Sequence, residues 1–270
     1  MIRTRLRYHR PRSLTETSEI LLAHHGNVAV LGGGTQLLPR MGRHVTEVEN
    51  VVDLKDLGLA GIGTVGGAIE IGARVTYADV LDSALLRAQL PLLPRMAQGV
   101  TGGRQLTQQA TLVGAACFAF PSADARGALA ALGAVVEIHG PDGLRSVPLT
   151  AFLVDAFAVD LRAGEFVRAM RMTPQRTGGY CKVKHSTGSW PIVTASAVRD
   201  DARGVRVTLG AVQAVPVIVQ LDDPHDPAEL KMRVDAAITA PWSDVLAPGE
   251  YRAAIAAAVA RRAVNELLGV

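Results

Sequence analysis

The feature that most constrains this chain is the segment VAVLGGGTQLLP at residues 28–39, in which an apolar, β-favouring run leads into three consecutive glycines. Glycine adopts backbone conformations that other residues avoid, and its missing Cβ lets another group approach the main chain closely. Bare amide N–H groups in such a turn form a concavity that binds anions such as phosphate. The segment therefore predicts either a tight turn between a buried strand and a short helix or an anion-binding loop.

A second glycine-bearing turn is predicted at residues 109–116 (QATLVGAA), and the segment PSAD follows it at residues 121–124. Two such turns would suffice to hold a pyrophosphate from both sides, because each supplies backbone N–H groups. Asp124 carries a carboxylate that could accept hydrogen bonds from ribose hydroxyls. Spacing alone forces neither inference, so both stay open at this point.

The segment GIGTVG at residues 61–66 matches the dinucleotide-binding fingerprint letter for letter. That fingerprint requires a helix directly after it, because the helix N-terminus holds the pyrophosphate. The residues that follow, GAIEIG at 67–72, are typical of a strand. We therefore reject a dinucleotide site here and interpret residues 61–66 as loop glycines before a strand.

Length and charge narrow the class of protein. A chain of 270 residues, 49% of them hydrophobic, can form one large or two modest domains and bury a sizeable core without disulfides. The net charge of +3 argues against nucleic acid as the main partner, because phosphate binding usually requires a strongly basic surface. Arginines 3, 5 and 7 alternate with other residues, which predicts a strand with one solvated face or an interface with an acidic partner.

The cysteines and histidines favour neither a disulfide framework nor a metal site. Cys117 and Cys181 are the only cysteines, and we predict that both are buried thiols. The histidines are scattered, and His185 is predicted to lie on the surface. With no apolar stretch of about 18 residues, no membrane span is expected. No leader segment is recognised, so a cytoplasmic protein is expected.

Strands and helices are predicted in mixed order without regular alternation, which indicates an α+β fold rather than a doubly wound sheet. A composition shift after Pro174, with RTGG at 176–179, predicts a domain boundary near residue 173. Local patterns predict a capping box at 13–16, a helix start at 76–79, hairpins over 135–147 and 192–209, a strand over 180–184, and a final helix over 250–268.

The order of these features resembles the flavin-binding medium subunit of the molybdenum hydroxylases, the family that includes carbon monoxide dehydrogenase and xanthine dehydrogenase. The resemblance covers almost the whole chain, and it depends on the order and spacing of several motifs together. These motifs are YHRPRSL at 8–14, GGGTQLLP at 32–39, IGARVT at 71–76, ATLVGA at 110–115, PSAD at 121–124, ALGA at 131–134, VPL at 147–149, YCKVKHSTGSW at 180–190 and EYR at 250–252.

This resemblance implies a two-lobed FAD-binding domain of the PCMH/vanillyl-alcohol-oxidase type over residues 1–173, split near residue 55, and a smaller α+β domain over 174–270. Backbone amides of residues 32–36 and 111–115 would hold the FAD pyrophosphate, with Asp124 by the ribose or adenine and Lys182 near the flavin ring. The implied cofactor-binding residues are Val30, Leu31, Gly32, Gly33, Gly34, Thr35, Gln36, Thr111, Gly114, Ala115, Asp124 and Lys182. It implies no catalytic residue and no metal ligand.

In such enzymes the flavin takes electrons from iron–sulfur clusters of a small subunit, and a molybdopterin-containing large subunit feeds those clusters. The resemblance therefore implies an oxidoreductase subunit that passes electrons through FAD to an external acceptor, not the subunit that hydroxylates a substrate. Flavin carries the electron chemistry in this arrangement, while the protein supplies position and electrostatics. The implied partners are the iron–sulfur small subunit and the molybdopterin large subunit of a hetero-oligomer.

The second turn departs from the family's usual pattern, Arg-Asn-x-Gly-Thr-Ile-Gly-Gly-Asn. Val113 stands where a glycine is usual, and Ala115 stands where an asparagine is usual. Valine resists positive φ and adds bulk, and alanine lacks an amide side chain that could bond the cofactor. These departures motivate one alternative, a family member with weakened or lost FAD binding that acts as a structural or ligand-binding subunit. A separate alternative is a stand-alone enzyme that uses the same cleft for another ligand.

Overall fold

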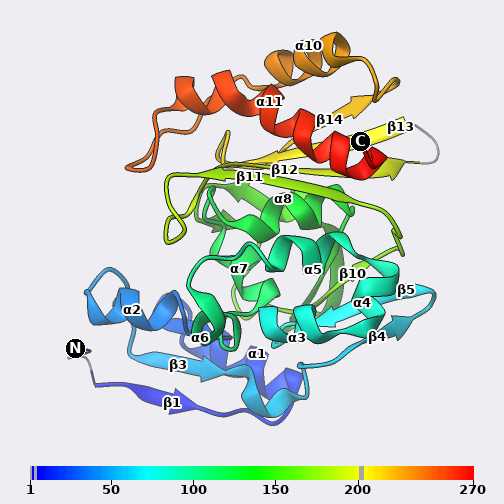
Figure 1. Cartoon of the computed structure of the whole chain (residues 1–270). Helices are drawn as coiled ribbons and strands as arrows, with labels where there is room; N and C mark the ends of the chain where they lie inside the picture. The colour runs from blue at the N-terminus through cyan, green and yellow to red at the C-terminus, as the bar shows by residue number, and fades with distance from the viewer. Residues whose placement is uncertain (1, 3–4, 201–203) are drawn as a thin grey trace.

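The chain begins with a small parallel sheet from which the glycine-rich segment emerges (Figure 1). The computed structural model describes residues 2, 5–200 and 204–270. In this sheet β1 (Arg7–His9) and β2 (Val28–Leu31) flank β3 (Asn50–Asp53), and both run parallel to it. Parallel strands need a crossover connection, and α1 (Leu14–Ala23) lies in the connection from β1 to β2 on the other side of β3. The strand predicted from the alternating arginines is confirmed only from Arg7 onward, because residues 5 and 6 are not in a strand; residues 3 and 4 lie outside the described residues.

The predicted capping box at the start of α1 is only half present. The Ser13 hydroxyl accepts a hydrogen bond from the Glu16 amide at 3.1 Å. The Glu16 carboxylate, however, accepts from the amide of Arg12, one residue before the position that a capping box requires. A complete capping box stands at α3 (Tyr77–Asp82), where Thr76 and Asp79 bond each other's backbone. The predicted helix start at 76–79 is therefore confirmed.

An antiparallel five-stranded sheet forms the middle of the molecule, in the order β4-β5-β10-β6-β7. Its strands are β4 (Ile62–Val65), β5 (Ala68–Gly72), β10 (Phe166–Met172), β6 (Val135–Gly140) and β7 (Gly143–Pro148). The interpretation of residues 61–66 as a loop is wrong, because Ile62–Val65 pair with β5 through a turn at Gly66 and Gly67, both with positive φ. A strand still follows the glycines, as predicted.

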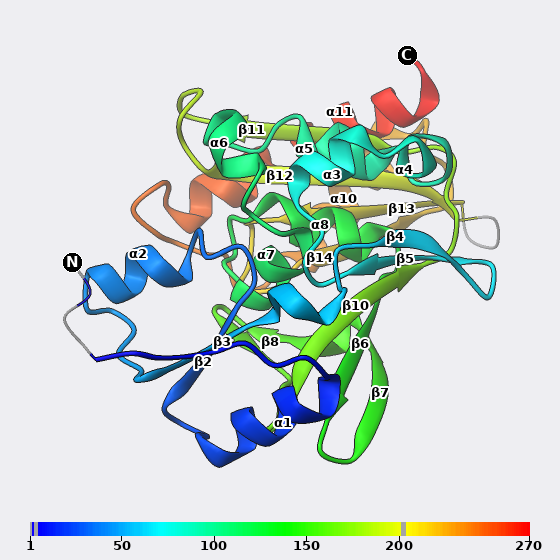
Figure 2. The same cartoon turned by 90° about the horizontal axis from the view of Figure 1, so that it is seen from below.

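Short helices pack beside this sheet (Figure 1), and several of them contribute residues to the cavity described below. They are α3, α4 (Ala84–Gln89), α5 (Leu92–Ala97), α6 (Gly103–Thr107), α7 (Leu112–Phe118), α8 (Asp124–Ala131) and α9 (Leu149–Phe152). Helix α2 (Leu37–Gly42) and the 3-10 turn η1 (Leu54–Leu57) lie beside the N-terminal sheet. A two-stranded sheet of β8 (Leu153–Asp155) and β9 (Ala158–Val159) follows α9. Figure 2 shows α1 between the N-terminal strands and β6, where Ser18 Oγ lies 3.0 Å from His139 Nδ1.

The C-terminal third forms an antiparallel sheet covered by helices. The sheet consists of β11 (Gly179–Lys184), β12 (Pro191–Asp200), β13 (Gly204–Gly210) and β14 (Val217–Leu221). Helices α10 (Pro227–Ala237) and α11 (Gly249–Leu268) lie on one face, and α8 lies against the other (Figure 1). The predicted hairpin and final helix are confirmed; residues 201–203 of the hairpin turn lie outside the described residues.

Helix α8 is the element that both halves of the chain share. All eight of its residues are buried, and it packs between α5 and α7 on one side and β12 and β13 on the other. Such burial requires small residues, and five of the eight are alanine or glycine (sequence DARGALAA). The whole arrangement is α+β, as predicted. Among the helices that the structure describes, none is long and apolar enough to cross a membrane.

Candidate functional site

The two glycine-bearing segments meet through their main chains. A Cβ added to Gly33 would lie only 1.9 Å from the carbonyl oxygen of Gln109, so the backbone there leaves no room for a side chain. Gly32 lies against the Thr111 hydroxyl, and Gly34 adopts a φ of 74°, which favours glycine. The first segment therefore needs its glycines for close approach and for its turn.

The first segment presents a row of amides without acceptors. The N–H groups of Gly33, Gly34, Thr35 and Gln36 donate to no other residue within the described part of the chain. Residues 32–37 also line a cavity. Residues 33–36 are half-buried, and four successive amides without an acceptor at a cavity wall form an arrangement suited to an anion.

Arg74 holds this segment in place. Its Nη1 donates a short hydrogen bond to the carbonyl of Gly32, and the same nitrogen lies 3.8 Å from the Asp53 carboxylate at the end of β3. The guanidinium therefore joins the glycine segment to the strand beside it. Sequence reasoning missed this role, although Arg74 lies within the IGARVT motif that contributed to the resemblance.

The second segment has a different structure from the predicted turn, because residues 112–118 form helix α7. Thr111 caps the helix, and its hydroxyl accepts from the amide of Gly114 at 3.2 Å. The amide of Leu112 donates to Val75, and that of Ala115 donates to the Thr111 carbonyl. Most of these amides thus have acceptors inside the protein, unlike those of the first segment.

Val113 causes no backbone strain at its position. It lies in the first turn of α7 and does not belong to the described residues with positive φ. Its side chain is 2% exposed and packs in the main hydrophobic core. The expected conflict between valine and a positive φ is therefore wrong. Val113 and Ala115 both line the cavity, so the side chains at these two positions still bear on ligand contacts.

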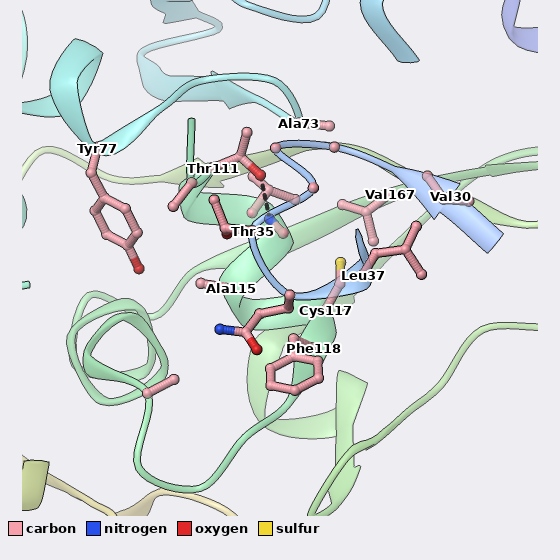
Figure 3. Close-up of a pocket in the computed structure, with 18 of the residues that line it drawn as sticks. Val30, Thr35, Leu37, Ala73, Tyr77, Thr111, Ala115, Cys117, Phe118 and Val167 are labelled. Carbon is pink, nitrogen blue, oxygen red and sulfur yellow. Dashed lines mark hydrogen bonds between the residues drawn. The ribbon is translucent and has the colours of Figure 1, made fainter. Parts of the chain in front are cut away.

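The segments enclose one side of a cavity of about 400 Å³, within the usual size of a cofactor site. Figure 3 shows the loop around Thr35 passing over α7, with Val30, Leu37 and Val167 on one side of the cavity and Tyr77 on the other. Tyr77 is buried, and burial together with the Asp124 charge raises the pKa of its hydroxyl. Predicted residues Val30, Gly32, Gly33, Gly34, Thr35, Gln36, Thr111, Gly114, Ala115 and Asp124 line the cavity, whereas Leu31 and Lys182 do not.

Four rings form what we call the aromatic wall: Phe118, Phe120, Phe157 and Trp190. Phe157 stacks on Phe120 with centroids 5.5 Å apart and meets Phe118 edge-on at 5.4 Å. Trp190 packs edge-on against Phe120 at 5.2 Å. Such pairs are favourable beyond the area that they bury. Sequence reasoning missed this wall, because its members come from three segments distant in the chain.

Cations and thiols complete the lining. Arg40 lines the cavity, and its guanidinium lies 5.5 Å from the ring centroid of Phe118. Cys117 also lines it, and burial raises the pKa of this thiol to about 12, so it stays protonated. Cys117 and Cys181 are both partly exposed rather than fully buried, so that prediction is wrong. His185 is exposed as predicted, and no cluster of metal-binding side chains occurs among the described residues.

Asp124 and Lys182 form a buried ion pair. Asp124 begins α8 and is 4% exposed, and its Oδ1 accepts from Lys182 Nζ at 2.8 Å and from the Tyr180 hydroxyl at 2.6 Å. Lys182 also donates a short hydrogen bond to the carbonyl of Gly99. The second carboxylate oxygen, Oδ2, accepts from no other described residue and remains available to the cavity that Asp124 lines. Burial and the Asp124 charge raise the pKa of Tyr180.

Similarity to known proteins identifies the family of this chain. Residues 4–173 match the family described as the FAD binding domain in molybdopterin dehydrogenase. The carbon monoxide dehydrogenase medium chain of Afipia carboxidovorans is 32% identical over 96% of this chain and 95% of that protein. The xanthine dehydrogenase FAD-binding subunit of Escherichia coli O157:H7 is 29% identical over 62% of this chain and 58% of that protein.

Solved structures of similar proteins support the same family. The carbon monoxide dehydrogenase of Hydrogenophaga pseudoflava contains a chain that superposes with a TM-score of 0.92 at 26% identity, covering 100% of this chain and 99% of that one. The free amides beside an apolar, aromatic-walled cavity fit a cofactor with a pyrophosphate and a flat ring. The chain therefore belongs to the family of FAD-binding domains of molybdopterin dehydrogenases, as the FAD-dependent medium subunit of an oxidoreductase rather than its molybdenum-containing subunit.

Proposed function

We propose that this chain holds FAD in the cavity between residues 32–36 and α7, and that it takes electrons from an iron–sulfur small subunit. The iron–sulfur clusters of that subunit receive their electrons from a molybdopterin-containing large subunit. An external acceptor then takes the electrons from the flavin. The observation that carries the location of the cofactor is the row of four free amides at Gly33, Gly34, Thr35 and Gln36. When bound, FAD supplies the redox chemistry, and the chain supplies binding, orientation and electrostatics.

We assign the pyrophosphate to the amides of residues 33–36. Their partial positive charges are fixed in direction by the glycine turn and by the bond from Arg74 to Gly32. Arg40, at the same wall, adds a full positive charge near the anion. The start of α7 contributes from the other side, chiefly by packing, since most of its amides bond within the protein. Val30, Leu31, Thr111, Gly114 and Ala115 are proposed as neighbours of the same group.

Asp124 is proposed to bind a sugar hydroxyl of FAD through Oδ2. Tyr180 and Lys182 both donate to Oδ1, so one oxygen is anchored and the other can accept. Lys182 is proposed to lie close to the flavin ring, because the Gly99 carbonyl that it holds adjoins Val100 and Thr101, which line the cavity. The same residue neutralises Asp124, so the pair adds no net charge beside the cofactor.

We propose that the FAD-binding domain spans residues 1–173, split near residue 55, and that residues 174–270 form the second domain. Two observations support this division: the family match ends at residue 173, and the buried apolar residues fall into two clusters. Tyr180 and Val198 join the first cluster although they follow the boundary, so the two domains share a packed interface. A cytoplasmic location stays a prediction.

The alternative of a scaffold subunit without flavin loses much of its support. It depended on Val113 and Ala115, and Val113 lies in an unstrained helix with its side chain in the core. The alternative of a stand-alone enzyme finds less support than a subunit, because the relatives named above are a medium chain and an FAD-binding subunit.

Flavin content of the purified chain tests the proposed cofactor site directly. We expect the visible absorbance of bound flavin and one FAD released per chain on denaturation. Gly33→Ala should abolish this uptake, whereas Gly61→Ala should retain it, because a Cβ there meets no atom within 4 Å. A chain that stays colourless with added FAD would overturn the proposal.

Purification from the native source tests the proposed partners. We expect a tagged chain to bring down two further subunits, one carrying iron and acid-labile sulfide and one carrying molybdenum. If the chain elutes alone under gentle conditions, with neither metal, the assignment of iron–sulfur and molybdopterin partners is wrong even if FAD is bound.

A further inference from the structure

Arg126 is a buried cation with no carboxylate partner among the residues that the structure describes. Its side chain lies in α8 and is 1% exposed. Nη1 donates to the carbonyl of Ala119 at 3.1 Å and Nη2 donates to that of Ala214 at 2.8 Å, while the buried Nε has no partner among the described residues. Burial lowers its pKa to about 10, so the guanidinium stays charged at neutral pH.

Such a group is unfavourable for stability taken by itself. Removing a charge from water costs several kcal/mol, and two carbonyl dipoles return only part of that. A methionine would fill part of the same space without the charge, although it is three heavy atoms smaller and makes neither hydrogen bond. The retained guanidinium is therefore better explained by what its two carbonyl partners do than by packing.

The first partner, Ala119, is hydrogen-bonded to a member of the aromatic wall. It ends α7 with a φ of 52°, an uncommon value for alanine. Its carbonyl also accepts from the amide of Phe157, whose φ is 59°. Two residues in the left-handed region are thus bonded to each other, and they carry or adjoin Phe118, Phe120 and Phe157.

The second partner, Ala214, belongs to the C-terminal domain. It lies in the loop between β13 and β14, and α11 fixes that loop through a hydrogen bond from Arg252 to the Ala211 carbonyl at 3.1 Å. Arg126 therefore spans from the cavity side of α8 to a loop that the C-terminal helix holds in place.

We infer that Arg126 is a positioning residue, which sets the shape of the aromatic wall by holding the Ala119 carbonyl at a fixed place relative to the Ala214 loop. The cavity thereby takes its final shape only when the C-terminal domain is docked. The effect on FAD affinity rests on the proposed function, whereas the effect on the wall itself does not.

The test compares Arg126→Met with Arg206→Met. Arg206 is a matched control because its Nη1 also donates to a carbonyl across the same interface, that of Ala131 at 3.1 Å, at the far end of α8 from the cavity. Four quantities are measured: thermal stability, near-ultraviolet circular dichroism of the ligand-free chain, peptide-resolved labelling of Cys117 by a small thiol reagent, and the Kd for FAD.

We expect Arg126→Met to change little in thermal stability, because removing a buried unbalanced charge offsets the two lost hydrogen bonds and the lost packing, yet to loosen the wall. Labelling of Cys117 and the Kd for FAD should each rise about tenfold, and the aromatic dichroism should weaken. Arg206→Met should lower thermal stability and leave the other three quantities unchanged.

The inference is overturned if Arg126→Met leaves Cys117 labelling and dichroism at wild-type values, or if both variants change them equally. Should Arg126→Met fail to fold, Arg126→Lys replaces it, because one ammonium group does not reach both carbonyls; wild-type labelling in that variant also overturns the inference. If the wild-type chain takes up no FAD, the proposed function fails, while labelling and dichroism still decide the role of Arg126.

Discussion

The two glycine-bearing segments look alike in the sequence and have different structures. Residues 32–36 form an open turn in which the amides of 33–36 have no acceptor among the described residues, whereas residues 112–118 form a helix whose first amides are mostly bonded. The first segment is built to bind and the second is built to pack against it. Glycine content is therefore a poor measure of ligand binding, and the number of free donors is a better one.

The largest expected effect tests the first segment at its tightest point. Gly33→Ala places a methyl group 1.9 Å from the Gln109 carbonyl, which forces the two main chains apart. We expect a loss of about 3 kcal/mol or more in the free energy of unfolding and no measurable FAD binding. Urea unfolding and flavin titration measure both. Wild-type affinity in this variant would show that the contact between the segments does not matter.

Restoring the family's glycine in the second segment should destabilise the protein and should not improve FAD binding. Val113→Gly removes a buried side chain and introduces glycine into a helix, which should lower the free energy of unfolding by about 2–4 kcal/mol. We expect no gain in FAD affinity, because the valine backbone is already helical. A tighter Kd for FAD would mean that the comparison drawn here is wrong.

Arg74→Met tests whether the open turn needs the hydrogen bond from Arg74 to keep its conformation. The variant loses the hydrogen bond to the Gly32 carbonyl, and a bond of this charged kind contributes about 1.5–3 kcal/mol. We expect the Kd for FAD to rise about tenfold or more. Arg87→Met is the control, since Arg87 also bonds carbonyls, those of Leu81 and Asp82, but does not line the cavity. Equal losses of affinity in the two variants would contradict the assignment.

The smallest effect is expected for Ala115→Asn. Ala115 lines the cavity, so an amide side chain there gains room to reach the cofactor. One new hydrogen bond should tighten the Kd for FAD about threefold to tenfold, equivalent to about 0.5–1.5 kcal/mol. Isothermal titration measures the change. Weaker binding would indicate that the second segment leaves no space for a side chain.

Local features of this fold were predictable because neighbouring residues determine them. The glycine turn, the capping box of Thr76 and Asp79, and the hairpin of β6 and β7 each follow from a few consecutive side chains. The strand at Ile62–Val65 was missed because its glycines suggest a loop, whereas pairing with β5 overrides that preference.

The hydrogen-bond partners of the site residues could not be predicted from the sequence. Asp124 and Tyr180 are 56 residues apart in the sequence, and the packing of α8 against the C-terminal sheet brings them together. Arg126 lies among alanines in a segment that reads as an ordinary small-residue helix, so its carbonyl partners at Ala119 and Ala214 leave no local signal. Motif order indicated the family, and tertiary packing decided which atoms stay free to bind.

The complete burial of helix α8 has consequences for truncation of the chain and for its synthesis. Because every residue of α8 is buried, a chain cut after residue 173 would expose one side of this helix to water. It would also leave Asp124 and Arg126 without Lys182, Tyr180 and Ala214. During synthesis the N-terminal part would then have to wait for the last third before its cofactor cavity is complete, so loading with FAD is expected to follow release of the whole chain.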